Sequence, residues 1–81
     1  MIKVERKDFI QYFASKKEFG EWLIEERFVK DIRDFVNEEY SAWEIVSEEY
    51  SWNDIWQHYW DAEVMQGVYD WINDGDAEEI N

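Results

Sequence analysis

The sequence predicts an all-α protein: a compact four- or five-helix bundle with a long C-terminal helix. The 81 residues include no proline and only three glycines, so the chain has few residues that interrupt helices. Apolar residues also recur at helical spacing behind three serines that are placed to start helices. The chain has no cysteine, so stability must come from its apolar residues (46% of the total, with 20% aromatic) rather than from disulfides.

The three serines each precede a predicted helix. Ser15 and Ser41 are followed three residues later by Glu, which is the capping-box pattern, and Ser51 is followed at the same distance by Asp. In this pattern the serine hydroxyl accepts a hydrogen bond from the backbone N–H of the acid, and the acid accepts one from the backbone N–H of the serine. We therefore expect a helix to begin directly after each serine.

The predicted helices follow one another with short connections. In chain order they cover residues 8–14, 16–26, 28–39, 42–50 and 52–73. The last is predicted in spite of Gly67, which costs a helix about 1 kcal/mol relative to Ala. Gly75 supplies the glycine that commonly follows a helix C-terminus. Residues 1–75 are thus predicted as a single helical domain and residues 76–81 as a frayed acidic tail.

Charge is divided unevenly along the chain. All eight Lys and Arg residues lie at or before Arg33, so residues 34–81 carry 14 acids and no base, and the net charge is −13. Self-repulsion of this charge opposes folding, and its field would attract a basic protein while repelling nucleic acid and anionic membranes. No apolar run reaches the roughly 18 residues that a membrane span needs, and the start of the chain lacks a signal-peptide core. We therefore expect a cytoplasmic protein.

Acidic residues are the main candidates for binding a partner. The seven carboxylates selected are Glu38, Glu39, Glu44, Glu48, Glu49, Asp54 and Asp61. On a helix Asp54 and Asp61 would share one face about 10 Å apart, given a rise of 1.5 Å per residue. Carboxylates held on helices could imitate duplex DNA, which carries roughly one charge per 1.7 Å of axis. Two alternatives remain open: acidic binding to a basic protein without mimicry, and a surface that is simply solvated.

Tryptophan supplies a second kind of candidate. Five of the six Trp residues lie after residue 34, and the dense aromatic pattern of residues 52–73 is typical of a central helix covered on several sides. Trp and Tyr also dominate the energetic centres of protein interfaces. We expect Trp43 and Trp60, each beside an acid, to be exposed anchors for a partner.

Catalytic and metal chemistry is not predicted. The chain has a single histidine, His58, no cysteine, no glycine-rich phosphate loop and no serine in a nucleophile elbow. We therefore expect no enzyme activity, no catalytic residue, no bound metal and no cofactor. The basic residues near the N-terminus are expected to pair with the acidic face or to serve a contact in a possible homodimer.

A further indication comes from the order of apolar and aromatic landmarks between residues 19 and 71. The landmarks are Phe19, Trp22, Leu23, Asp31, Ile32, Asp34, Phe35, Tyr50, Ile55, Tyr59, Ala62 and Trp71. This pattern resembles the YozE-like family of small helical domains, which are similar to the sterile alpha motif (SAM). The resemblance implies a helical interaction module without catalytic residues.

Together these features predict an acidic inhibitor that binds a basic nuclease or another DNA- or RNA-binding protein. By analogy it resembles the small acidic DNA mimics that phages direct against restriction or CRISPR systems, which would place it in the host cytoplasm. Two other functions remain open: a SAM-like interaction module without an inhibitory role, and an immunity or antitoxin protein that neutralises a basic nuclease.

Overall fold

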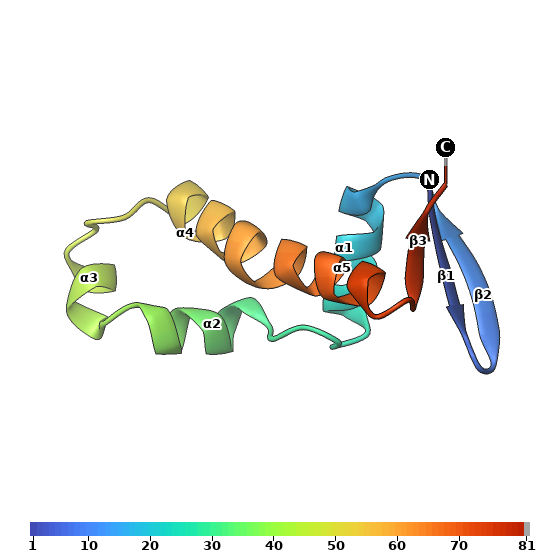
Figure 1. Cartoon of the computed structure of the whole chain (residues 1–81). Coiled ribbons are helices and arrows are strands. Elements are labelled where there is room, and N and C mark those ends of the chain that lie inside the picture. Colours follow the sequence, from blue (N-terminus) through green and yellow to red (C-terminus); the bar gives the residue numbers. More distant parts are fainter. Residues whose placement is uncertain (81) are drawn as a thin grey trace.

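The computed structural model describes residues 1–80 and has an α+β fold, so the all-α prediction is wrong. A three-stranded antiparallel sheet in the order β2-β1-β3 stands at one end, and the helices extend away from it (Figure 1). The elements are β1 (Ile2–Arg6), β2 (Phe9–Phe13), α1 (Lys16–Glu25), α2 (Ile32–Glu39), α3 (Ala42–Val46), α4 (Trp52–Tyr59), the π-helical segment η1 (Trp60–Val64), α5 (Met65–Asn73) and β3 (Ala77–Glu79). The molecule is elongated, at 45 × 23 × 19 Å.

Strand β2 stands where the sequence predicted a helix over residues 8–14. It forms a hairpin with β1 in which Arg6 pairs with Phe9 and Ile2 pairs with Phe13. The buried residues of β1 alternate with exposed or half-buried ones, as expected of a sheet with one covered face. The segment from Phe9 to Phe13 is rich in aromatic and β-branched residues, and this propensity for strands prevails over the lack of helix breakers.

Strand β3 corrects the prediction of a frayed tail at residues 76–81. Ala77 pairs with Val4 and Glu79 pairs with Ile2, and the side chain of Ala77 is buried on the covered face of the sheet. Residue 81 lies outside the described residues. The pairing joins segments more than seventy residues apart, so no local pattern could indicate it.

Two apolar clusters lie along the molecule. We call the first the sheet-end core; its buried members are Ile2, Val4, Phe13, Phe19, Leu23, Val68, Trp71 and Ala77. We call the second the distal core; its buried members are Phe35, Tyr59 and Val64. Val29 packs against both clusters and joins them.

The three serine caps are confirmed. The Oγ atoms of Ser15 and Ser51 accept hydrogen bonds from the N–H groups three residues on, at 3.2 and 3.1 Å. Ser41 and Glu44 form the complete capping box, with the two bonds at 3.2 and 3.0 Å. At the first cap the box is incomplete, because Glu18 accepts from the N–H of Ala14 instead of that of Ser15.

The helix predicted over residues 28–39 begins later, at Ile32. Asp31 caps it by accepting a hydrogen bond from the Asp34 N–H at 2.9 Å. The residue before this cap is held from across the molecule, because the Tyr59 hydroxyl donates to the Lys30 carbonyl at 2.7 Å. Glu63 accepts from the Lys30 N–H at 2.9 Å. These tertiary bonds occupy the backbone groups of Lys30 and fix the connection between α1 and α2.

Three helices end in the same arrangement, with one residue at positive φ. These residues are Arg27 after α1 (φ 60°), Glu48 after α3 (φ 55°) and Gly75 after α5 (φ 86°). After α3, for example, the Glu48 N–H donates to the Ile45 carbonyl and the Glu49 N–H donates to the Glu44 carbonyl. This is the Schellman motif, and it ends α3 four residues before the predicted position. Of the three helix ends, only the one at Gly75 was predicted from its residue type, because glycine commonly follows a helix C-terminus.

The long helix predicted over residues 52–73 is present as α4, η1 and α5 in succession. The π-helical segment in its middle adds a wide turn where the helix crosses α1. Gly67 has a packing reason, because a Cβ atom at this position would lie 2.5 Å from Cγ1 of Val29. Glycine at position 67 therefore lowers the helix propensity but lets Val29, in the α1–α2 connection, pack close to the helix backbone.

Candidate acidic surface at the distal end

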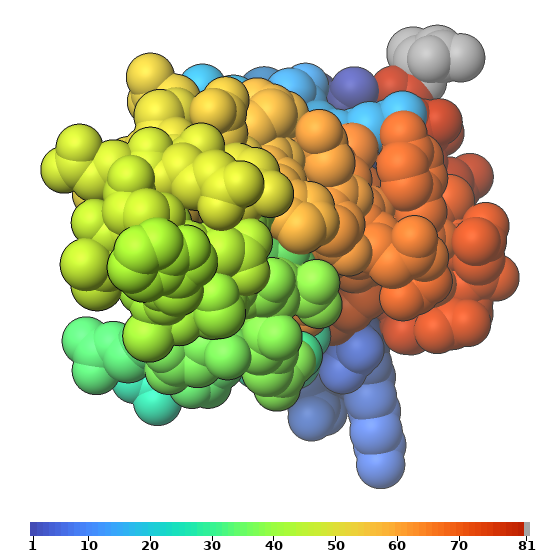
Figure 2. All heavy atoms as spheres, turned by 90° about the vertical axis from the view of Figure 1, so that its left-hand side faces the viewer, coloured from blue at the N-terminus to red at the C-terminus, as the bar shows by residue number. Residues whose placement is uncertain are grey.

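Six of the seven predicted carboxylates lie at the end of the molecule farthest from the sheet. Glu38 and Glu39 end α2, Glu44 lies in the first turn of α3, and Glu48 and Glu49 follow α3. Asp54 lies in the first turn of α4. Figure 2 looks onto this end, where residues 41–50 form a protrusion in front of α2 and α4. The structure thus brings together carboxylates from three helices.

Three of these carboxylates line one hollow of about 470 Å³. Its residues are Glu39, Tyr40, Glu44, Tyr50, Asp54 and His58. The Tyr40 hydroxyl lies 2.7 Å from Nδ1 of His58, and the rings of Tyr40 and Tyr50 meet edge to face at 5.2 Å. Carboxylate oxygens beside aromatic faces suit the guanidinium or ammonium group of an Arg or Lys side chain.

The pKa of Tyr40 reflects this surrounding charge. Burial raises the pKa of the Tyr40 hydroxyl above its usual value, and the neighbouring Tyr50, Glu44, Glu39 and Asp54 raise it further. Each of these groups disfavours a negative charge on the phenol. The carboxylates of Glu39, Glu44 and Asp54 thus all lie close enough to the Tyr40 hydroxyl to raise its pKa, and together they form a negative region around it.

The remaining carboxylates of this end have different surroundings. Glu38 forms an ion pair with Lys30, which partly neutralises it. Glu48 lines a second hollow, together with Ile45, Tyr50, Ser51, Trp52 and Ile55. Glu49 is exposed. The free negative charge of this end is thus carried by Glu39, Glu44, Glu48, Glu49 and Asp54.

Large apolar side chains lie exposed among these acids. Trp43 is 73% exposed, in agreement with the prediction, and Val46 and Trp52 are 76% and 68% exposed. Trp52 belongs to the dense aromatic pattern that predicted a helix covered on several sides, but it was not among the Trp residues expected to be exposed. It occupies the first position of α4, directly after the Ser51 cap, and borders a hollow beside Ile32 and Val36 of α2. Its place at a capped helix start was the available signal.

Asp61 and Trp60 lie apart from the other predicted residues. Asp61 is on η1, where its carboxylate accepts a hydrogen bond from Nε2 of Gln57 at 3.0 Å. Trp60 is half-buried and packs over Gly20, where a Cβ atom would lie 3.0 Å from the indole ring. We therefore define the distal surface without them, as Glu39, Trp43, Glu44, Val46, Glu48, Glu49, Tyr50, Trp52 and Asp54.

No metal centre or membrane span is found in the part of the chain that the structure describes. Within residues 1–80, no three His, Asp or Glu side chains converge in a way that could hold a metal ion. None of the helices in this range combines the length and apolar character needed to cross a membrane.

Comparison of the chain with protein-family models, curated proteins and solved structures finds no match. The resemblance to YozE-like domains therefore stays a prediction.

Proposed function

We propose that the protein is an acidic inhibitor whose distal surface occupies the DNA-binding groove of a basic protein, such as a restriction or CRISPR nuclease. One observation carries this proposal: residues 34–64 hold nine acids and no base, and most of them lie on capped helices gathered at one end. A groove built for duplex DNA carries Arg and Lys side chains that attract such a surface. An inhibitor of this kind encoded by a phage would act in the host cytoplasm.

The local structure supports a fixed arrangement of these charges. The capping box at Ser41 and the Ser51 cap hold the starts of α3 and α4, which carry Glu44 and Asp54. A set of carboxylates held in place loses less conformational entropy on binding than carboxylates on a flexible tail. Preorganisation of this kind favours specific occupation of a groove over general attraction to any basic surface.

A second function is favoured by the exposed apolar residues. Trp43, Val46 and Trp52 have no counterpart in a phosphate backbone, and exposed Trp residues are typical anchors of protein interfaces. An interaction module or an immunity protein would use them as the centre of its interface and the acids as its rim. Such binding would depend much less on salt than groove occupation does.

The test is capture by the immobilised full-length chain from a bacterial lysate at about 50 mM and then about 500 mM salt. We expect the captured protein to be a DNA-binding protein that is released both by the higher salt and by a competing DNA duplex. The effect of the distal acids is measured with the combined variant Glu39→Gln, Glu48→Gln, Glu49→Gln and Asp54→Asn. We expect it to bind the captured protein at least about tenfold more weakly, because it removes four charges from the binding face.

A matched control removes the same amount of charge elsewhere. Glu21→Gln, Glu25→Gln, Glu26→Gln and Glu78→Gln change four exposed acids on and after α1 and on β3. We expect this variant to bind nearly as well as the original chain. Equal weakening by both variants would show that net charge alone attracts the partner. Binding that resists salt and DNA but is lost in Trp43→Ala would favour the second function.

A further inference from the structure

A strip of the sheet at strand β2 is left open on the face that packs against the helices. Val4 of β1 and Gln11 of β2 are register partners on this face, yet Val4 is fully buried whereas Gln11 is exposed. Phe9, on the same face of β2, is 37% exposed. The close cover of the sheet therefore ends between β1 and the outer side of β2.

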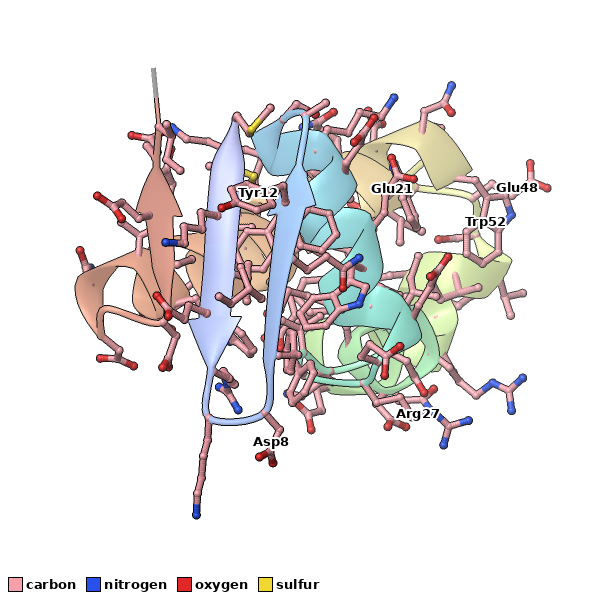
Figure 3. The ribbon with its side chains drawn as sticks, turned by 90° about the vertical axis from the view of Figure 1, so that its right-hand side faces the viewer. Asp8, Tyr12, Glu21, Arg27, Glu48 and Trp52 are labelled. Atoms are coloured by element: carbon pink, nitrogen blue, oxygen red, sulfur yellow. The ribbon has the colours of Figure 1, made fainter. Side chains whose placement is uncertain are left out.

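Helix α1 borders this strip. Its half-buried Trp22 contacts Phe9 and Phe13 of β2, with ring centroids 6.0 and 5.4 Å apart. Figure 3 looks onto the sheet and shows α1, with Glu21, continuing past the β2 edge on the covered side. A strand added beside β2 would therefore lie over α1 and be covered on its inner face.

The outer edge of β2 offers unpaired backbone groups. On the β3 side of β1, the Glu5 N–H donates to the Asp76 carbonyl at 3.0 Å. Because alternate residues of an antiparallel strand bond to opposite neighbours, the even-numbered residues of β1 bond toward β2, where their register partners are odd-numbered. The N–H and C=O groups of Ile10 and Tyr12 then point away from β1, and within residues 1–80 no other strand pairs with them.

Strand β2 also lacks the features that normally protect an edge. Soluble proteins usually shorten their edge strands or place charges, prolines or bulges on them. Strand β3 follows this rule, since it has three residues and two are glutamates. Strand β2 has five residues, Phe-Ile-Gln-Tyr-Phe, none of them charged, and its pairing with β1 runs without interruption. An exposed sheet edge of this kind can accept an extended peptide as an added strand.

The helices limit what can pair with this edge. They extend past β2 on the covered side of the sheet (Figure 3), so the helices of a second copy paired here would overlap those of the first. Such a pair would also set the acidic ends of two chains, each with a net charge of −13, side by side. A single extended segment, such as a tail or linker of another protein, needs only the width of one strand, about 4.8 Å.

The charge beside the edge favours a basic segment. Residues 17–27, on and directly after α1, carry four exposed acids and two exposed bases, and Lys16 before them is paired with Glu79 at 2.7 Å. Glu18 lies at the end of the edge, because its carboxylate accepts a hydrogen bond at 3.1 Å from the N–H of Ala14, directly after β2. These acids can meet Lys or Arg side chains that point from an added strand toward α1.

The two faces of the β2 edge favour different side chains. An inward side chain of the added strand lies beside Gln11 and over α1, where Lys or Arg can lay its apolar stem on the open strip and keep its charge near the acids. An outward side chain lies beside Ile10 and Tyr12, which are 56% and 55% exposed on the uncovered face. A β-branched residue opposite an aromatic one is a favourable cross-strand pair.

We propose that β2 binds an extended segment of a partner protein, in which Lys or Arg alternates with β-branched residues, as an antiparallel fourth strand. The β-branched residues exchange N–H and C=O hydrogen bonds with Ile10 and Tyr12, because directly opposed residues of a hydrogen-bonded antiparallel pair share both bonds. The edge is remote from the distal surface along the 45 Å axis, so both can be occupied at the same time (Figure 1).

The probe is a capped peptide of alternating Lys and Val, about eight residues long, added to the full chain. Calorimetry measures its binding, and amide exchange followed by NMR locates it. Exchange should slow at least about fivefold at Ile10 and Tyr12, whose N–H groups become bonded, and stay unchanged at Gln11, which already bonds to β1. Slower exchange only at other residues, or no binding at about 1 mM peptide, would overturn the proposal.

Two methylated peptides separate strand pairing from attraction by charge. N-methylation of the Val residues removes the N–H groups that face β2 and should weaken binding at least about tenfold. N-methylation of the Lys residues alters only N–H groups that face solvent, so this peptide should bind nearly as well as the original. Both peptides carry the same charge. Equal binding of the two would show that charge alone holds the peptide, and the proposal would then be wrong.

A change in the protein tests the same hydrogen bonds. Tyr12→Pro removes an outward N–H that takes no part in the pairing with β1, and proline is tolerated at such an edge position. Tyr12→Val keeps this N–H and is the matched control. Tyr12→Pro should bind the peptide at least about fivefold more weakly than Tyr12→Val, and equal binding would contradict the proposal. Circular dichroism checks the fold of both variants, and the methylated peptides decide if Tyr12→Pro does not fold.

The charge variants of the proposed function separate the two sites. The variant that removes four acids on and after α1 and on β3 should bind the peptide at least about threefold more weakly, because it removes acids beside the edge. The variant that removes four acids from the distal surface should bind it nearly as well as the original chain. These effects are the reverse of those expected for the DNA-binding partner, so either proposal can fail without the other. Weakening by the distal variant alone would overturn the edge site.

Discussion

The two ends of the molecule use aromatic residues in opposite ways. At the sheet end, Phe9, Phe13, Phe19, Trp22, Phe28 and Trp71 form one continuous set of ring contacts, with centroids 5.0–6.1 Å apart. At the distal end, Trp43 and Trp52 stand in solvent and no residue of α3 is buried. The sheet end therefore supplies most of the stability, whereas the distal end buries Phe35 and Tyr59 but keeps Trp43 and Trp52 available for contact.

Charge follows the same division. Residues 28–64 hold ten acids against two bases, whereas the rest of the chain holds eleven acids against six bases. At the sheet end these bases are used: Arg6 lies 3.9 Å from the Trp71 ring and forms an ion pair with Asp76, and Lys16 forms one with Glu79 at 2.7 Å. Excess charge is thus concentrated where the packing is thinnest. This is the arrangement expected if the distal end serves binding at a cost in stability.

The largest expected effect tests this division with one tryptophan from each end. Trp71→Ala should lower the free energy of unfolding by about 3–5 kcal/mol, because it removes a buried ring from the centre of the sheet-end core. Trp43→Ala should change it by less than about 0.5 kcal/mol, because the side chain is mostly exposed. Urea denaturation followed by circular dichroism measures both. A large loss in Trp43→Ala would mean that the distal end is stabilised by contacts of Trp43.

The sequence indicated the local structure well where local signals exist. Ser15, Ser41 and Ser51 each have a side chain that can cap a helix, so three helix starts were predictable. The positive φ of Arg27 and Glu48 was not predictable, because nothing in either residue type marks a left-handed position. Strand β3 was missed because it pairs with a segment at the other end of the chain. Strand β2 was missed for a different reason: it forms a local hairpin with β1, and the helix prediction rested on the lack of helix breakers rather than on its aromatic and β-branched residues.

The candidate site was predictable to a similar extent. The absence of bases after Arg33 indicated acidic surface, and most of the chosen carboxylates do gather at one end. The separation of Asp61 and Trp60 from the rest depends on how α4 and η1 turn against α1 and α2. That rotation is fixed by tertiary contacts such as the bond from Tyr59 to Lys30, which no spacing in the sequence reveals.

The next effect concerns Tyr59, which ties the two ends together. Its side chain is fully buried, and burial raises the pKa of its hydroxyl to about 12. Tyr59→Phe removes the hydrogen bond to the Lys30 carbonyl and should cost about 1 kcal/mol at neutral pH. Thermal or urea denaturation measures the loss.

The pH dependence of this effect has a definite sign. Above about pH 10 the tyrosine ionises in the unfolded chain but stays protonated in the folded one, so its contribution to stability falls by about 1.4 kcal/mol per pH unit until about pH 12. The phenylalanine ring of the variant has no proton to lose, so the difference between the variant and the original chain should shrink between about pH 10 and 11 and then reverse. A difference that stays constant across this range would show that the hydroxyl is not held neutral by the fold.

The smallest effect compares the two non-glycine residues at positive φ, one near each end. Arg27→Gly and Glu48→Gly should each stabilise the protein by about 0.5–1 kcal/mol, because glycine adopts the left-handed conformation without strain. Glu49→Gly is the matched control, because it removes the carboxylate next to Glu48 without relieving a positive φ. The stability of this variant should stay the same or fall. Arg27→Gly and Glu48→Gly should differ in their effect on partner binding, because Glu48 belongs to the distal surface and Arg27 does not. If Glu48→Gly gains stability but loses affinity for the DNA-binding partner, the Glu48 carboxylate serves binding rather than folding. If Arg27→Gly and Glu48→Gly bind the partner equally well, Glu48 does not belong to the binding surface.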